Sequence, residues 1–305
     1  MFQRAASRVR SEHWIAKNGL AAAGDGPPHI VSLIGPSDDD RRLLAAEANI
    51  DAHTLDSALD PDELSRLELD QDWAAVIYKC PGPGWSVGSA GAVLTAGRLW
   101  VVAPDRDPLA GVRGRVTSPA AAVLRMVASA TAGFRERLRA VQRESEELQS
   151  KINLALENRH LIAMFELERA LVYYVSALGC NESLLGRMRH SAAKLGLSGE
   201  EEAELLEDVE IENRQCLRQA EMQSNIIAGL MDARASIVAN NLNRMMKTLS
   251  VVGVAIMAPT LVVSLFSMNV PLPLGAADSP RSFWIVVTAA AAAAMAFIAP
   301  WLRKR

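Results

Sequence analysis

Cysteine and histidine are scarce in this chain of 305 residues. The three cysteines, Cys80, Cys180 and Cys216, lie far apart, are odd in number and form no CxxC pair. This pattern argues against a disulfide framework or a zinc site and fits free thiols in a reducing compartment. The five histidines form no ligand-spaced pair, and no nucleophile–base pattern accompanies them. We therefore expect a protein that is not an enzyme.

Several other signals are missing. The net charge of −3 leaves no basic excess for nucleic acid, so we expect no nucleic-acid partner. The Gly/Pro-rich stretch Pro81–Gly91 lacks the Gly-Lys-Ser/Thr ending of a phosphate loop, and we expect no organic cofactor. Residues 1–23 contain no apolar h-region, so we expect no secretory signal peptide and a cytoplasmic location for the N-terminal part.

Charge is also absent from two segments near the C-terminus, Thr248–Ala277 and Ser282–Leu302. A bilayer core requires roughly 20 apolar residues in a helix. A buried soluble helix of this length would normally carry a polar stripe, and the alanine-rich second segment has none. The sequence predicts transmembrane helices at 248–269 and 282–302, joined by an external Pro-rich loop at 270–281.

Basic residues flank both predicted spans. Arg244 and Lys247 precede the first span, and Arg303–Arg305 follow the second. Positive residues concentrate on the cytoplasmic side of a membrane. We expect a multi-pass protein of the inner (plasma) membrane, with both termini and the basic tail at 303–305 in the cytoplasm.

The soluble part changes composition at Ser118-Pro119, where a serine can cap a helix whose first turn holds proline. We predict a mobile arm at 1–26, an α/β domain at 27–118 and long helices at 119–247. The expected elements of the domain are strands His29–Ile34 and Asp72–Cys80, a helix Arg41–Asn49, a loop Pro81–Gly91, and a hairpin of Ala92–Thr95 with Leu99–Ala103. Within the helices we expect breaks at Cys180-Asn181 and at Gly196–Gly199.

The last soluble helix is expected to begin near Gly199 and to continue into the first span. Apolar residues recur every seven positions along it, at Met231, Val238, Met245 and Val252. From residue 200 to 266 such a helix would be on the order of 100 Å long. One chain cannot bury so long a stalk, so we expect self-association around an axis.

One face of this helix gathers small and polar side chains through the first span. These residues follow one another in steps of three and four, and we call them the stripe: Asn243, Met246, Leu249, Gly253, Met257, Thr260 and Ser264. Lipid gives hydroxyl groups no reason to lie there, whereas a close helix contact or a water-filled axis does. Spacing alone leaves both readings open.

The first span ends in Phe266-Ser267-Met268-Asn269, which puts a carboxamide at the outer mouth of the helix that carries the stripe. A ring of such carboxamides would present carbonyl oxygens to a passing cation. Mg²⁺ gives up its water reluctantly, so neutral oxygens that bind its hydration shell suit it better than a tight cage.

The chain resembles the CorA family of divalent-cation channels, and it aligns with that family without a gap from Asp208 to Asn269. The shared residues include Asn243…Met246-Lys247…Leu249 and Met257-Ala258-Pro259-Thr260. The family carries Gly-Met-Asn at the end of the first of two C-terminal spans, after a long stalk helix. The resemblance implies an α+β membrane protein with a cytosolic N-terminal α/β domain, assembled as a funnel-shaped homopentamer in membrane lipid.

The resemblance also implies functional residues. Ser267, Met268 and Asn269 would form the selectivity filter, and Leu249 and Met257 a hydrophobic constriction in the pore lined by the stripe. Asp232 would add an acidic ring at the cytoplasmic entrance. Asp208 would be half of a regulatory Mg²⁺ site between subunits, with Asp56 and Asp60 as candidates for the other half.

Two departures from the family keep alternatives open. Ser267 replaces the motif glycine, and the loop holds a single acid, Asp278, against Arg281 instead of the family's Met-Pro-Glu-Leu. With so little negative charge in the loop, electrostatic attraction of cations to the outer mouth of the pore should be weak. We expect a Mg²⁺ channel or transporter gated by cytosolic Mg²⁺. The alternatives are the same fold carrying Zn²⁺, Co²⁺ or Ni²⁺, and a membrane scaffold that no longer conducts.

Overall fold

The computed structural model describes residues 9–16, 19–21, 27–48, 50, 52–154, 158–268 and 280–302. The chain divides into two compact units, Met1–Ala228 and Gly229–Arg305, which are described separately below. The first unit holds a mixed sheet covered by helices, and the second holds the apolar C-terminal helices.

Seven strands form one sheet within the described part of the first unit, in the order β2-β1-β3-β7-β6-β5-β4. The strands are β1 (Val9–Ala16), β2 (Gly19–Ala21), β3 (Ile30–Ile34), β4 (Arg66–Leu69), β5 (Trp73–Pro81), β6 (Val87–Thr95) and β7 (Arg98–Ala103). β3 and β7 run parallel, with Ile30 opposite Leu99, and the other neighbours are antiparallel. The predicted hairpin is confirmed: β6 and β7 meet at Thr95 and Arg98, and Gly97 takes the left-handed φ of 84° that this turn requires.

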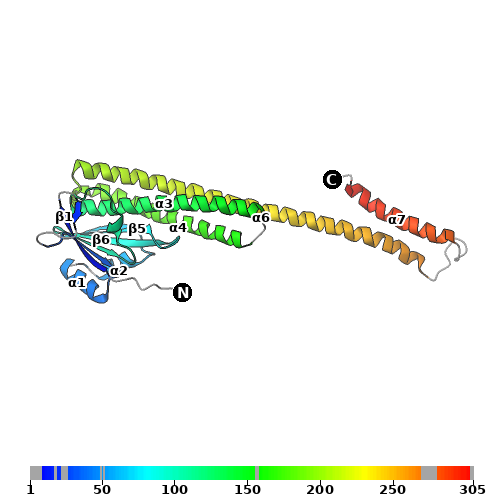
Figure 1. The fold of residues 1–305 in the computed structure, drawn as a ribbon, viewed down its shortest axis with the longest axis horizontal. Coiled ribbons are helices and arrows are strands. Elements are labelled where there is room, and N and C mark those ends of the chain that lie inside the picture. Colours follow the sequence, from blue (N-terminus) through cyan, green and yellow to red (C-terminus); the bar gives the residue numbers. More distant parts are fainter. Residues whose placement is uncertain are drawn as a thin grey trace. The chain divides into compact units, whose positions relative to one another are not determined.

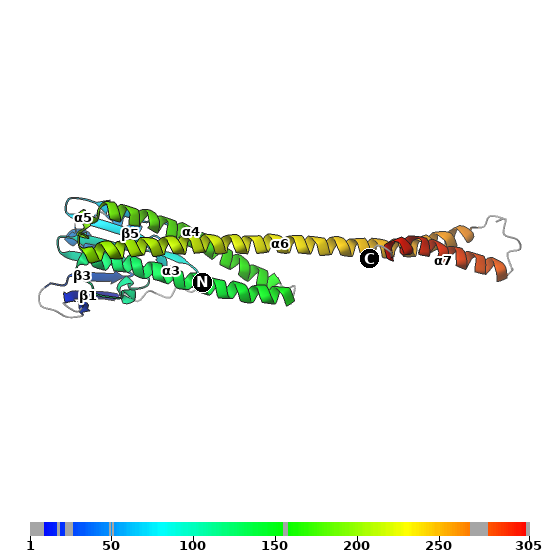
Figure 2. The ribbon, with the colours of Figure 1, turned by 90° about the horizontal axis from the view of Figure 1, so that it is seen from above.

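Helices cover both faces of the sheet (Figures 1 and 2). The helical elements are α1 (Asp38–Ala48), α2 (Ala52–Leu59), the 3₁₀ turn η1 (Pro108–Gly111), α3 (Pro119–Leu154), α4 (Asn158–His190), α5 (Ala192–Leu195), α6 (Glu200–Phe266) and α7 (Pro280–Leu302). α1 and α2 lie on one face, and α3 and α4 pack on the other. The start of α6 packs on the same face as α3 and α4, through Leu206 and Val209.

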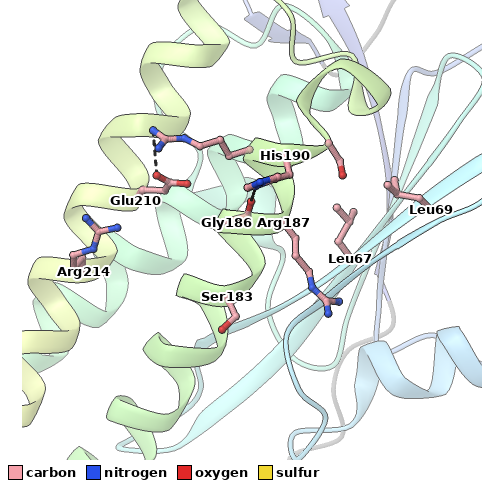
Figure 3. Close-up of a pocket in the computed structure, with 10 residues that line it drawn as sticks. Leu67, Leu69, Ser183, Gly186, Arg187, His190, Glu210 and Arg214 are labelled. Atoms are coloured by element: carbon pink, nitrogen blue, oxygen red, sulfur yellow. Dashed lines mark hydrogen bonds and ion pairs between the residues drawn. The ribbon is translucent and has the colours of Figure 1, made fainter.

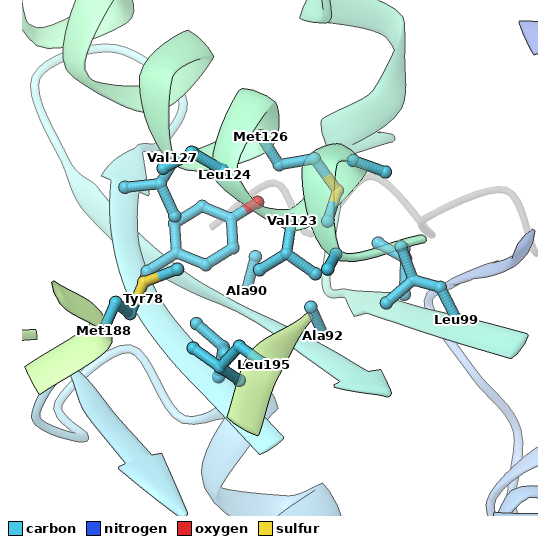
Figure 4. Close-up of a cluster of buried hydrophobic side chains, with 14 of the residues drawn as sticks. Tyr78, Ala90, Ala92, Leu99, Val123, Leu124, Met126, Val127, Met188 and Leu195 are labelled. Carbon is cyan, nitrogen blue, oxygen red and sulfur yellow. The ribbon is translucent and has the colours of Figure 1, made fainter. Parts of the chain in front are cut away.

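Alternation along the strands produces the two cores. In β5, Val76 and Tyr78 belong to the cluster under α3 and α4, whereas Ala75 belongs to the cluster under α1 and α2. Figure 4 shows the first cluster, in which the Tyr78 ring lies among side chains of α3 such as Val127. This burial of apolar surface is what holds the helices to the sheet.

The predicted helix boundaries at Ser118-Pro119 and Gly196–Gly199 are confirmed. The Ser118 hydroxyl accepts the N–H of Ala121 at 3.0 Å and caps α3. Gly196 ends α5 with a left-handed φ of 75°, and α6 begins at Glu200. α6 then continues without interruption to Phe266, as expected for the long stalk helix.

Three local expectations differ from the structure. Residues 9–16 and 19–21 of the expected mobile arm are strands, because β1 pairs through its backbone with β3 although its sequence shows no apolar alternation. The expected loop Pro81–Gly91 is shorter, since β6 already begins at Val87. Cys180-Asn181 is not a helix break, because it lies inside α4 and Asn181 is buried there.

Candidate functional site

The apolar second half of α6 is not buried by any part of the chain that the structure describes. Its most apolar 18-residue window has a mean hydropathy of 2.3, and none of it is buried. A core helix of a soluble protein with this composition would be mostly buried. Among the described residues, α6 is the one helix long and apolar enough to cross a membrane, while α7 contributes a shorter apolar stretch, Phe283–Ala296.

The stripe predicted from spacing lies on this uncovered segment. At 100° per residue its members, from Asn243 to Ser264, fall within an arc of about 120° on α6, and Asp232 falls in the same arc. Leu249 is 66 % exposed and Met257 is 70 % exposed. From residue 251 to residue 266 the opposite face carries apolar residues alone, including Val251, Ala255 and Val262. α6 therefore presents two chemically different faces to its surroundings.

The hydroxyl groups near the stripe are oriented by the helix backbone. Thr260 Oγ1 donates to the carbonyl oxygen of Ile256 at 2.7 Å, and Ser267 Oγ donates to that of Val263 at 2.8 Å. With the hydrogen directed at the helix, each hydroxyl oxygen keeps its lone pairs for an outside donor. Such oxygens suit the water shell of a cation.

The structure describes only part of the C-terminal end of the stripe. α6 ends at Phe266, and Ser267 and Met268 follow as exposed residues. Asn269 lies outside the described residues, as does most of the predicted loop at 270–281. The structure therefore places the stripe and its helix, and the assignment of a filter to residues 267–269 stays a prediction.

The candidate regulatory carboxylates are not brought together within one chain. Asp208 is exposed on α6, whereas Asp56 and Asp60 belong to α2 and the turn after it, on the other side of the sheet. Asp56 pairs with Arg41 at 2.6 Å, and Asp60 accepts the N–H of Asp62. Among the described residues no group of three or more His, Cys, Asp or Glu could hold a metal ion. A site containing Asp208 and one of these acids would need a second copy of the chain.

A buried polar link between α4 and the sheet was missed by the sequence analysis. Asn181 Oδ1 accepts the N–H of Lys79 at 2.9 Å and the hydroxyl of Ser65 at 2.7 Å, and Asn181 Nδ2 donates to the Lys79 carbonyl at 2.9 Å. The Lys79 ammonium donates to the carbonyl of Pro61 and to Ser89 Oγ. Burial lowers the pKa of Lys79 and raises the pKa of the neighbouring Cys80 thiol to about 11. The sequence signal for this link was Asn181 itself, a polar residue in the middle of an otherwise helical segment.

Comparison with known proteins agrees with this architecture. The sequence matches the family described as CorA-like Mg²⁺ transporter protein over residues 106–304. It is 23 % identical over 282 residues to the cobalt/magnesium transport protein CorA of Methanocaldococcus jannaschii, covering 88 % of both chains. The complete structure of the CorA magnesium transporter from the same organism superposes with a TM-score of 0.82 at 21 % identity, covering 98 % of each chain.

Two further solved structures share the fold. The full-length CmaX protein gives a TM-score of 0.74 at 16 % identity over 97 % of each chain. The cytoplasmic domain of ZntB from Vibrio parahaemolyticus gives 0.54 at 12 % identity over 73 % of this chain.

The mixed sheet, the long helix α6 and its uncovered apolar half are the architecture shared with the full-length magnesium transporter. More particularly, the chain belongs to the CorA-like Mg²⁺ transporter family, whose profile covers well over half of its length. Members of this family are transporters of divalent cations and not enzymes.

Proposed function

We propose that the protein conducts Mg²⁺, as a hydrated ion, through a pore lined by the stripe face of α6 in a funnel-shaped homopentamer. The observation that carries this proposal is the two-faced helix: from residue 251 to residue 266, hydroxyl groups lie on the stripe face and apolar groups alone on the opposite face. A closed ring of helices lets the first face meet water and the second meet lipid or neighbouring helices. Leu249 and Met257 would form the hydrophobic constriction, and Ser267, Met268 and Asn269 the filter.

We further propose that α7 forms the second span at 282–302 and that both termini are cytoplasmic. The basic flanks of the two apolar segments support this topology. Cytosolic Mg²⁺ would bind between Asp208 of one subunit and Asp56 or Asp60 of the next, neutralise these carboxylates and hold the closed state. Under this proposal Asp208→Asn weakens the Mg²⁺-dependent protection of α6 from proteolysis, and unchanged protection would remove Asp208 from the sensor.

The test of conduction is Mg²⁺ uptake into liposomes that contain the purified protein and a Mg²⁺-sensitive dye. Asn269→Ala should abolish most of the uptake, because it removes the proposed ring of carbonyl oxygens. Asn241→Ala is the matched control, since Asn241 is an exposed asparagine of the same helix that lies outside the arc of the stripe. No uptake by the wild type, or equal uptake by wild type and Asn269→Ala, would refute the proposal.

A second candidate cargo is Co²⁺, because the curated relative is described as a cobalt/magnesium transport protein. Zn²⁺ and Ni²⁺ belong to the same group of alternatives, although no Cys or His lies in the span 248–269 to favour a softer ion. Competition between these ions and Mg²⁺ for uptake into the same liposomes distinguishes a Mg²⁺ transporter from a transporter of Co²⁺, Zn²⁺ or Ni²⁺. Absence of flux for every cation would instead support the non-conducting scaffold, for which Ser267 in place of glycine is the motivating feature.

A further inference from the structure

A cavity of about 1050 Å³ runs along α3 in the first unit. Its walls come from the end of β5, the loop around η1, α3 and the start of α6. We call it the arginine groove. The loop contributes Arg106 and Arg113, and α3 contributes Arg125, Arg135, Arg137, Arg139 and Arg143. Three carboxylates, Asp107, Glu136 and Glu212, also line it, so the groove has an excess of four positive charges.

Most of these charges have no ion-pair partner among the residues that the structure describes. Arg135 pairs with Glu212 at 2.9 Å, and Asp107 is engaged by Ser32 Oγ and the N–H of Leu109. Three exposed arginines, Arg106, Arg139 and Arg143, make no ion pair and no side-chain hydrogen bond with any residue that the structure describes.

Other guanidinium groups are held in place by backbone oxygens. Arg125 donates to the carbonyl of Arg113 at 3.1 Å, and Arg137 donates to the carbonyl of Gly82 at 3.0 Å. Arg125 Nε is buried and has no hydrogen-bond partner. Gly114 makes room for Arg125, because a Cβ there would lie 2.5 Å from its Nη1. The groove is thus partly preorganised around positive charge.

A second cavity, of about 550 Å³, provides a contrast (Figure 3). It is also rich in arginine, but Glu210 pairs with Arg189 at 3.2 Å, and Arg214 pairs with Glu182 at 3.0 Å. Its charges are largely compensated by its own chain, whereas those of the arginine groove are not. Like charges collected without partners repel one another, and a bound anion would remove that repulsion.

We propose that the arginine groove is a binding site for a free oligophosphate anion, such as a nucleoside triphosphate or inorganic polyphosphate. Arginine binds phosphate through planar, paired hydrogen bonds, which makes a guanidinium cluster selective for this chemistry. Arg125 and Arg143 are 18 residues apart, or about 27 Å along the helix. That length suits several linked phosphates better than one, and the volume is close to the upper end of the range for small-molecule sites, about 1,000 Å³.

The test is calorimetric titration of the full-length protein, in non-ionic detergent and metal-free buffer, with sodium tripolyphosphate. We expect saturable binding, a higher melting temperature with the anion, and weaker binding when salt rises from about 50 mM to about 300 mM. Arg139→Gln with Arg143→Gln should lower the affinity by about tenfold or more. Arg187→Gln, an exposed arginine of the second cavity, is the matched control and should change it by less than about twofold.

Two further titrants identify the source of the phosphate. Inorganic monophosphate should bind at least about tenfold more weakly than tripolyphosphate, because it engages fewer guanidinium groups. Short-chain phosphatidylglycerol that bound as tightly as tripolyphosphate would overturn the choice of a free oligophosphate.

The site itself would be disproved by non-saturable tripolyphosphate binding, or by equal losses of affinity in the double variant and the control. Because these titrations contain no divalent cation, their outcome is independent of whether the protein conducts Mg²⁺.

Discussion

At the scale of single residues, Asn181 completes the sheet at a point where a strand stops. β4 pairs with β5 from Leu69 opposite Ala74 to Arg66 opposite Ile77, and the pairing ends there. The next backbone groups of β5 on that side, those of Lys79, are met by the carboxamide of Asn181, which acts as both acceptor and donor. An amide side chain therefore replaces a missing backbone unit and ties α4 to the sheet.

Asn181→Leu should lower the free energy of unfolding by about 2–4 kcal/mol. The leucine is similar in size, but it leaves the buried N–H and C=O of Lys79 without partners. The measurement is thermal or chemical unfolding of the purified protein. Ser183→Ala on the same helix is the control, because its exposed hydroxyl bonds only to the carbonyl of Gly179. Equal stability of Asn181→Leu and the control would contradict this role.

Cys80 should react slowly and with a steep pH dependence. Burial raises the pKa of its thiol to about 11, so the reactive thiolate is scarce at neutral pH. Alkylation by iodoacetamide, followed by peptide mass spectrometry, should accelerate by about tenfold per pH unit from pH 8 to pH 10. A rate that levels off by pH 9 would show that burial does not raise the pKa of this thiol.

At the scale of elements, α6 combines two environments in one helix. In the first unit, residues such as Leu206, Val209 and Cys216 are buried against the rest of the domain. In the second unit, Leu249 and Met257 are largely exposed in the single chain. The change from buried to exposed apolar residues along a continuous helix indicates that lipid or other copies of α6 cover its second half.

Met257→Ser should raise Mg²⁺ influx several-fold in the liposome assay. It replaces a bulky apolar side chain at the proposed constriction by a small hydroxyl, which lowers the barrier to wetting of the pore. Ala255→Ser is the matched control, because it adds a hydroxyl to the opposite face of the same span. An equal effect of both substitutions, or a loss of flux in Met257→Ser alone, would argue against a constriction at Met257.

The elements differ in how well the sequence predicts them. The long stalk helix, the β6–β7 hairpin and the Ser118 cap follow from local periodicity, turn residues and capping, which act within a few residues. β1 could not be predicted, because its stability depends on backbone pairing with residues of β3 that are seventeen or more positions away, and not on its own apolar pattern. Asn181 was misread as a break because its partners, Ser65 and Lys79, are over a hundred residues away.

In the candidate site, too, the features set by local spacing could be predicted, and those that depend on residues distant in the sequence could not. The stripe on α6 follows from helical spacing, and the structure keeps it on one face of a continuous helix. The arginine groove was not predicted, because its walls come from segments distant in sequence. The relation of Asp208 to Asp56 or Asp60 also exceeds what one chain can define, since these residues lie on opposite sides of the sheet.

At the scale of the whole molecule, self-association is the proposed solution to two problems of the single chain. Under the proposal, the uncovered stripe would face water, and Asp208 with Asp56 or Asp60 would complete a cation site only between two subunits. A closed ring of subunits supplies both. The membership of the chain in a family of divalent-cation transporters is consistent with such an arrangement.

The most direct measurement is an electron cryomicroscopy structure of the full-length protein in lipid nanodiscs. Our account predicts five subunits around an axis, with Leu249, Met257 and Thr260 of every α6 facing that axis and Asn269 forming a ring at the outer mouth. It also predicts that Ala255 and Val262 face away from the axis. A structure in which the stripe faces lipid, or in which the opposite face of α6 seals the axis, would contradict it.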